Sequence, residues 1–216
     1  MGASVLLLAF VSITACESQR EVPPAAPAPD SYHSLLARLK ARDTSIDFTA
    51  LRLAYAASAD YAPYAHESDA LPYWESMNAA LERQDYRRVV SQADSALNID
   101  YLDIRTHIVR AHAAEQLGDT NAAAWDRAVA DRLFESIMAS GRGTRDSPYV
   151  VVSMAEEYAV LAMTGYEQGR QSLSECRSRP CDILETTHRD IQKKRTFHFD
   201  ISLPKAYLNR LHQGKP

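Results

Sequence analysis

The chain has 216 residues, of which 46% are hydrophobic and 24% charged, and its formal net charge is -4 at pH 7. The length suits one ordinary domain with an appendage, and the composition is that of a folded soluble protein, which excludes intrinsic disorder. A phosphate-binding surface needs a concentrated basic face, and the overall charge does not favour one. We therefore expect no nucleic-acid partner.

The first feature along the chain is an apolar run over residues 5–13, interrupted only by Ser12. It is too short to cross a bilayer as a helix, which takes about 20 apolar residues, but it suits the core of a signal peptide. The next residues, 13–16 (ITAC), resemble the lipobox of bacterial lipoproteins, whose cysteine is acylated. One departure is that residues 1–15 contain no Lys or Arg. A buried apolar N-terminal helix is the alternative.

The segment after this cysteine, residues 17–30, is rich in proline and has no large apolar side chain except Val22. Such a segment forms a semi-rigid spacer of roughly 3.1 Å per residue, which reaches about 40 Å. We expect residues 1–16 to be a lipoprotein signal and residues 17–30 a tether, with the acyl chains on Cys16 holding the protein to a membrane. This predicts a periplasm-facing place in the bacterial cell envelope. Glu17 after the cysteine favours the outer membrane over the inner one.

Two further cysteines, Cys176 and Cys181, have the turn-like sequence RSRP between them. An oxidising periplasm would allow them to close a hairpin tip with a disulfide. Free buried thiols are the alternative that the sequence leaves open. A zinc site would need further ligands at the spacing of zinc fingers, and the sequence has none there. We therefore expect no metal ion and no cofactor.

Residues 31–141 carry helical signals and form the expected helical domain. Ser31 is placed to cap a first helix with a leucine-rich face, and Asp47 is placed to cap a second helix that begins at Phe48. Between Ser58 and Pro72 the chain contains prolines and many aromatic residues. We expect an ordered loop there.

A repeat of 34 residues follows, in which Asp85 aligns with Asp119 and small or apolar residues recur at matching helical positions. Gly118 supplies the left-handed residue that ends one helix, whereas Gln84 occupies this place in the first unit. This period resembles tetratricopeptide repeats and covers residues 70–137. A generic antiparallel helical bundle is the alternative, because sequences rich in Ala, Leu and Arg produce chance periods.

Residues 142–216 form a second expected module. A β-branched run over residues 148–152 predicts a short strand, and Ser153 with Glu156 fits the capping box of a helix. A last short helix is expected after Pro204. Three strands are expected before it, over residues 171–176, 181–187 and 195–202. The predicted fold class is mainly α with a small α+β end: tetratricopeptide-like helical hairpins followed by a short antiparallel β-meander.

Four stretches carry a resemblance that spans most of the chain. They are residues 46–64, 156–173, 181–186 and 197–201. Together they resemble a bacterial family catalogued as domain of unknown function 4919. Members of that family resemble this chain in the order of their parts, which is a signal, helical repeats, and then a helix with a β-meander. The resemblance implies no reaction, and it does not imply the pairing of Cys176 with Cys181, which is peculiar to this chain.

Candidate catalytic groups are few, and we expect no catalytic residue. His198 and Asp200 share one face of a predicted strand and Glu185 lies on its neighbour, so these three would form the site of a hydrolase in an alternative interpretation. Polar residues on the solvated face of a sheet also explain them, and we favour that explanation. His107 and His112 are five residues apart, whereas two metal ligands on one helix face need a spacing of three or four.

The expected role is binding or assembly, with a concave helical face offered to another envelope protein. The expected contact residues project from the first helices of the repeat and are Asn78, Arg105 and His112. A group of aromatic residues would line a groove in an alternative interpretation, but helical spacing favours packing in the core. This group consists of Tyr55, Tyr61, Tyr64, Tyr73 and Trp74.

Overall fold

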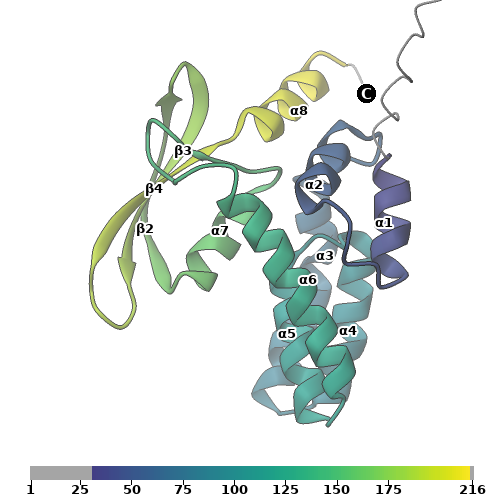
Figure 1. The fold of residues 1–216 in the computed structure, drawn as a ribbon. Helices are drawn as coiled ribbons and strands as arrows, with labels where there is room; N and C mark the ends of the chain where they lie inside the picture. Colours follow the sequence, from purple (N-terminus) through teal and green to yellow (C-terminus); the bar gives the residue numbers. More distant parts are fainter. Residues whose placement is uncertain (1–30, 215–216) are drawn as a thin grey trace, which may run out of the picture.

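The computed structural model describes residues 31–214, so the predicted signal, Cys16 and the predicted tether lie outside the described residues. Over that range the chain forms eight helices and four strands (Figure 1). In chain order they are α1 (Tyr32–Lys40), α2 (Phe48–Ala57), α3 (Ala65–Glu82), α4 (Tyr86–Ile99), α5 (Ile104–Gln116), α6 (Thr120–Met138), β1 (Tyr149–Val150), α7 (Met154–Met163), β2 (Tyr166–Cys176), β3 (Arg179–His188), β4 (Lys194–Asp200) and α8 (Ser202–His212). The fold is mainly α with a small sheet near the C-terminal end, which confirms the predicted class.

The two predicted caps at the start of the helical region are confirmed. The Ser31 hydroxyl accepts a hydrogen bond from the Ser34 N–H at 3.2 Å. The Asp47 carboxylate accepts from the N–H groups of Thr49 and Ala50 at 2.8 and 3.0 Å. These oxygens satisfy backbone donors that the first turn of a helix leaves without a carbonyl partner. Helices α1 and α2 therefore begin where the sequence predicts.

The predicted loop from Ser58 to Pro72 is wrong in its second half, because α3 begins at Ala65 and continues through Pro72. Proline in a helix interior removes one backbone hydrogen bond and costs about 3 kcal/mol. Burial of Met77 and Ala80 against α4 and α5 offsets this cost. Tertiary packing here overrides the local signal of the proline.

The hairpins α3–α4 and α5–α6 repeat one turn geometry. Gln84 and Gly118, 34 positions apart, both have left-handed backbone conformations, with φ of 57° and 80°. The residue that follows each, Asp85 or Asp119, caps the next helix with its side chain. It also donates its N–H to a carbonyl five residues earlier, at 2.9 Å in both turns. The correspondence with tetratricopeptide repeats themselves stays a prediction.

The sheet has the strand order β1–β4–β3–β2. Strands β2, β3 and β4 pair antiparallel, as predicted, but β1 pairs with β4 in parallel. The sheet is therefore mixed, and the meander forms only three of its strands. Phe197 and Phe199 on β4 are fully buried, whereas His198 between them is half-buried. This alternation turns one face of the sheet toward the helices.

Helix α7 lies between the sheet and α6 (Figure 1). One hydrophobic core takes side chains from α1, α2, α6, α7 and the sheet, so residues 31–141 and 142–216 share it. Representative members are Leu51, Leu133, Val160 and Phe199. Of the aromatic group, Tyr55 and Tyr61 belong to this core. None of the helices within residues 31–214 combines the length and apolar composition that crossing a membrane requires.

Candidate functional site: a buried ion pair beside a polar cavity

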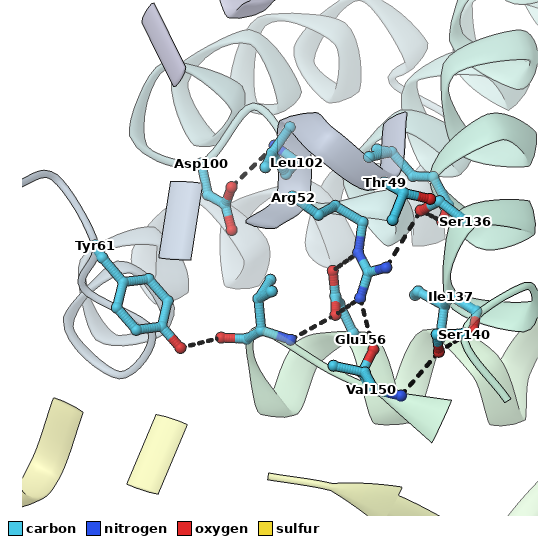
Figure 2. Close-up of polar contacts among 12 residues, drawn as sticks. Thr49, Arg52, Tyr61, Asp100, Leu102, Ser136, Ile137, Ser140, Val150 and Glu156 are labelled. Atoms are coloured by element: carbon cyan, nitrogen blue, oxygen red, sulfur yellow. Dashed lines mark hydrogen bonds and ion pairs between the residues drawn. The ribbon is translucent and has the colours of Figure 1, made fainter. Parts of the chain in front are cut away.

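Arg52 is only 2% exposed although it carries a charge. It lies on the buried face of α2 together with Phe48, Leu51 and Tyr55. Its guanidinium meets the carboxylate of Glu156 on α7, with Nε donating to Oε1 and Nη2 donating to Oε2, both at 2.6 Å (Figure 2). Paired, charge-assisted hydrogen bonds of this kind are the strongest that side chains form.

The ion pair also holds the backbone at β1 and just after it. Arg52 Nη2 donates to the Val150 carbonyl at 2.8 Å, and Glu156 Oε2 accepts from the Val152 N–H at 2.8 Å. The Tyr61 hydroxyl donates to the Val152 carbonyl at 2.7 Å (Figure 2). Together these bonds fix the segment that joins the sheet to α7.

The capping box predicted for Ser153 and Glu156 is wrong. Ser153 makes no side-chain hydrogen bond to the first turn of α7, and the Glu156 carboxylate binds Arg52 and the preceding backbone instead. Ser136 on α6 completes the surroundings of the guanidinium, because its hydroxyl accepts from Arg52 Nη1 at 3.3 Å. The network therefore joins α2, α6, β1 and α7.

Asp100 lies beside this network at the end of α4 (Figure 2). One of its carboxylate oxygens accepts a hydrogen bond from the Leu102 N–H at 2.9 Å. Burial raises the pKa of Asp100 to about 7, and the nearby charge of Asp103 adds to the rise. A carboxyl with a pKa near neutrality is typical of functional sites, although structural ion-pair networks also produce one.

Two neighbouring cavities of about 10 and 30 Å³ open beside Asp100. The residues that line both are Tyr55, Asp100, Asp103, Ser153 and Ala155. Cavities of this size hold one or two groups as large as a water molecule. They have no room for an organic substrate of metabolite size.

Tyr55 and His66 form one wall of the larger cavity, and the Tyr55 hydroxyl lies 2.9 Å from His66 Nδ1. Burial lowers the pKa of His66, although the charges of Asp69 and Asp60 oppose this effect. Burial also raises the pKa of Tyr55. Both groups are therefore neutral near pH 7, and the Tyr55 oxygen also accepts a hydrogen bond from the Ala62 N–H at 3.4 Å.

Asp103 links α3 to α5 at the mouth of the cavity. Its Oδ2 accepts from Trp74 Nε1 at 3.2 Å and from the Thr106 hydroxyl at 2.6 Å. Its Oδ1 accepts from the Arg105 N–H at 3.1 Å. The Arg105 guanidinium lies over the Trp74 ring, 5.1 Å from its centroid. Arg105, an expected contact residue, is thus part of this wall and only half-buried.

The other two expected contact residues lie farther along the same helices. Asn78 is exposed on α3. His112 is exposed on α5 and meets the Tyr86 ring edge-on, with 5.9 Å between the ring centroids. The structure therefore brings Arg105, but not Asn78 or His112, to the cavity.

The residues of the alternative hydrolase site lie on one face of the sheet, but the two carboxylates pair with arginines and not with the histidine. Asp200 pairs with Arg179 at 2.5 Å, and Glu185 pairs with Arg170 at 2.5 Å. His198 Nδ1 is buried without a hydrogen-bond partner in the described chain. No hydrogen bond within residues 31–214 joins the three side chains into a catalytic arrangement.

His107, which sequence spacing argues against as a metal ligand, has a structural role. Its Nδ1 lies 2.8 Å from the Asp126 carboxylate and its Nε2 lies 2.9 Å from the Tyr101 carbonyl. Arg110 binds Asp126 as well. Within residues 31–214, His, Cys, Asp and Glu side chains form no group of three or more that could hold a metal ion.

Cys176 and Cys181 lie at the tip of the β2–β3 hairpin, with their sulfur atoms 2.01 Å apart. Arg177 and Ser178 form the turn between the strands, and both have left-handed φ, of 50° and 64°. Two such residues in succession are typical of the tight hairpin turns that match the twist of the strands. The geometry is that of a disulfide, and its formation in the cell stays a prediction.

A buried pair of carboxyl groups between α7 and the sheet has no signal in the sequence that would predict it. Glu157 is fully buried and Asp182 is 3% exposed. Both carboxyl oxygens of Glu157 and Oδ1 of Asp182 lack a hydrogen-bond partner in the described chain, while Gln171 donates to Asp182 Oδ2. Burial raises the pKa of Glu157 to about 9, and the charge of Asp182 adds to the rise. Glu157 is therefore a neutral acid at pH 7.

A known protein family matches the part of the chain that carries the ion pair and Asp100. The model of a family described as domain of unknown function (DUF4919) matches residues 28–210. The chain belongs to the DUF4919 family. The matched range of this DUF4919 chain includes Arg52, Asp100 and Glu156, and two of the stretches that carry the resemblance contain the two members of the ion pair. No curated protein and no solved structure matches the chain.

Proposed function

We propose that this DUF4919 protein is a lipid-anchored protein of the bacterial cell envelope that binds another envelope protein through the face formed by α3 and α5. The observation that carries the proposal is the contact of Arg105 on α5 with the ring of Trp74 on α3. Both side chains remain partly exposed. Tryptophan and arginine are enriched among the residues that dominate the binding energy of protein interfaces.

Exposed apolar side chains extend this face on both helices. Leu71 precedes Trp74 by three residues on α3 and is 54% exposed, and Ile108 follows Arg105 by three residues on α5 and is 38% exposed. Residues three apart lie on the same side of a helix. The face thus combines apolar groups with an arginine and an aromatic ring, a composition typical of the core of an interface.

The proposed partner is an extended segment of a second envelope protein, because adjacent helical hairpins offer an elongated surface to such segments. Acylation of Cys16 and a tether over residues 17–30 would present the face some distance from the membrane. The hairpin tip with Cys176 and Cys181 suits an oxidising compartment. Asp200 and Glu185 pair with arginines, and His198 Nδ1 has no hydrogen-bond partner in the described chain. Binding is therefore the function that we propose.

Site-specific photo-crosslinking in intact cells tests the proposal. A photo-reactive amino acid at Asn78 or at His112, both exposed on the proposed face, should capture the same partner. The matched control is Arg132, which is exposed on α6 and should not capture it. Arg105→Ala, combined with the photo-reactive group at position 78, should lower the yield about tenfold, the loss expected for a residue worth about 1.4 kcal/mol.

Three results would contradict this function. The first is the same product from position 132, because the contact would then not be specific to the α3–α5 face. The second is no product from position 78 or position 112. The third is an unchanged yield in Arg105→Ala, measured on protein with unaltered circular dichroism, because the arginine would then contribute nothing to binding.

A further inference from the structure

The cavity beside Asp100 is lined by polar atoms that the described fold does not use. Leu102 donates to one oxygen of Asp100, and the other oxygen receives no hydrogen bond from residues 31–214. Ser153 is 9% exposed, lines both cavities and makes no cap hydrogen bond. Asp100 is half-buried, so its second oxygen remains open to the cavity. A carboxylate oxygen and a hydroxyl that both face one small space suit a ligand that donates hydrogen bonds.

We propose that this cavity binds a primary ammonium group, such as the end of a lysine side chain or of a small alkylamine. The cavity shares Trp74 and Arg105 with the partner-binding face proposed above, but the inference does not rest on that function, because its acceptors are Asp100 and Ser153. An ammonium group has three N–H donors and no acceptor. The cavity offers two acceptors, the second oxygen of Asp100 and the hydroxyl of Ser153, and the third N–H of the ligand would remain hydrated. The Tyr55 oxygen is already in contact with His66 Nδ1 and with the Ala62 N–H, so Tyr55 contributes its ring to the cavity wall.

The charges around the cavity leave one carboxylate without a counterion. Arg52 on α2 and Glu156 on α7 neutralise each other. Arg105 at the start of α5 faces Asp103, with 3.7 Å between Nε and Oδ1. Asp100 remains: no side chain of residues 31–214 forms an ion pair with it, and Arg105 attracts it only weakly from a longer distance. A cation in the cavity would supply the missing charge.

The ends of the surrounding elements favour a cation as well. Helix α4 ends at Asp100, and the C-terminal end of a helix carries partial negative charge. The N-terminal end of α5 is already capped by the Asp103 side chain, and Glu156 accepts a hydrogen bond just before α7. Helix α3 contributes the neutral His66 and the exposed Glu67 to the lining of the cavity.

The size and shape of the site select among cations. Cavities of about 10 and 30 Å³ admit an ammonium head but have no room for a trimethylated one. A calcium ion needs at least six oxygen ligands, and the cavity offers few. Tyr55 and Trp74 form aromatic walls of the larger cavity, and aromatic faces attract cations. A primary amine therefore fits better than a metal ion or a quaternary amine.

Binding should depend on pH, because a proton on Asp100 competes with the ammonium group. The pKa of Asp100 is about 7. As the pH increases toward this value, the affinity should increase about tenfold for each pH unit. Above this value the affinity should stay constant. The other groups that face Asp100 oppose this trend little, because Asp103 and Glu156 are paired and burial keeps His66 neutral.

Nuclear magnetic resonance of the labelled full chain in detergent micelles tests the inference. The probe is methylammonium chloride, and the reporter is the Leu102 amide, which is bonded to Asp100. We expect a saturable shift at pH 8 and none with tetramethylammonium chloride at the same ionic strength. Asp100→Asn should weaken binding at least tenfold and abolish the pH dependence, and Ser153→Ala should weaken it severalfold. Asp131→Asn on the exposed side of α6 should change nothing.

A second probe, Nα-acetyl-lysine amide, distinguishes the source of the amine. If this probe competes with methylammonium, the site binds a lysine side chain. If methylammonium binds but the probe does not compete with it, the site binds a free amine. The inference is overturned by the absence of a saturable shift at pH 8, by an equal response to tetramethylammonium, or by undiminished binding in Asp100→Asn. Should Asp100→Asn fail to fold, undiminished binding in Ser153→Ala together with a flat pH profile would overturn it.

Discussion

Arg52 and Glu156 are 104 residues apart in the sequence, yet they form an ion pair with hydrogen bonds of 2.6 Å. Their side chains are only 2% and 6% exposed. Removing two charges from water is unfavourable, so such a pair persists only where its hydrogen bonds are complete. Here Ser136 and the backbone at Val150 and Val152 complete them. The pair ties the helical region to the module that carries the sheet.

Arg52→Met should lower the free energy of unfolding by about 3–5 kcal/mol, because it leaves the Glu156 carboxylate buried and unpaired. The double variant Arg52→Met, Glu156→Leu should recover much of this loss, since an apolar pair of similar volume often replaces a buried ion pair without cost. Urea denaturation followed by circular dichroism measures both effects.

Arg132→Ala provides the control for this change. Arg132 and Glu135 form an exposed pair on α6 at 3.4 Å, and loss of such a pair changes stability by about 0.5 kcal/mol or less. If Arg52→Met lowers the free energy of unfolding no more than Arg132→Ala does, the buried pair does not stabilise the fold.

Local signals in the sequence predicted the parts of the fold that local physics decides. Ser31, Asp47 and Gly118 were assigned correctly because a cap or a left-handed turn depends only on nearby backbone. Pro72 misled the prediction because packing of α3 against its neighbours outweighs the propensity of one residue. The parallel pairing of β1 with β4 joins residues about 50 positions apart, and no local pattern reports it.

The candidate site was largely beyond sequence reasoning for the same reason. Arg52 falls on the apolar face of its helix, beside Leu51 and Tyr55. A charge in that position signals a buried partner, but it does not name one. Glu156 matched a local capping pattern, whereas its carboxylate binds a side chain from a distant helix. Asp100 carries no signal at all, because its burial arises from how α2, α4 and α7 meet.

Cys16→Ala should separate the protein from the membrane. The proline-rich segment after it has no apolar face, so attachment would depend on the acyl chains alone. We expect the variant in the soluble envelope fraction, or retained with its signal uncut, on fractionation and immunoblotting. Recovery of a mature, membrane-bound variant would disprove lipid anchoring through this residue.

Cys176 and Cys181 should be linked in protein taken from its native compartment. The bond closes a loop of only six residues from Cys176 to Cys181, and short loops gain least from closure, so its contribution to stability is about 2 kcal/mol at most. Non-reducing peptide mapping by mass spectrometry should find the linked peptides. Complete alkylation of both thiols without reductant would show instead that they are free.

Glu157→Gln should raise stability increasingly as the pH rises. Burial raises the folded-state pKa of Glu157 from 4.5 to about 9, so the folded chain keeps a proton that the unfolded chain has lost between these values. The unfolded state then binds fewer protons, and stability falls as pH rises, by up to about 1.4 kcal/mol per pH unit. The stability associated with this group is fully present below pH 4.5 and is lost as the pH passes through about 9. Glutamine does not titrate, so the variant does not lose stability in this way as the pH rises.

The interval from pH 7 to pH 9 isolates the effect, because the raised pKa of Asp100 contributes in the same direction only up to about 7. Urea denaturation at several pH values in this interval should show the curves of wild type and Glu157→Gln diverging toward alkaline pH. Glu135→Gln changes an exposed position of α6, and its curve of stability against pH should be parallel to that of wild type. Parallel curves for Glu157→Gln as well would mean that Glu157 is already ionised in the folded protein, and that Asp182 and its surroundings tolerate the second charge.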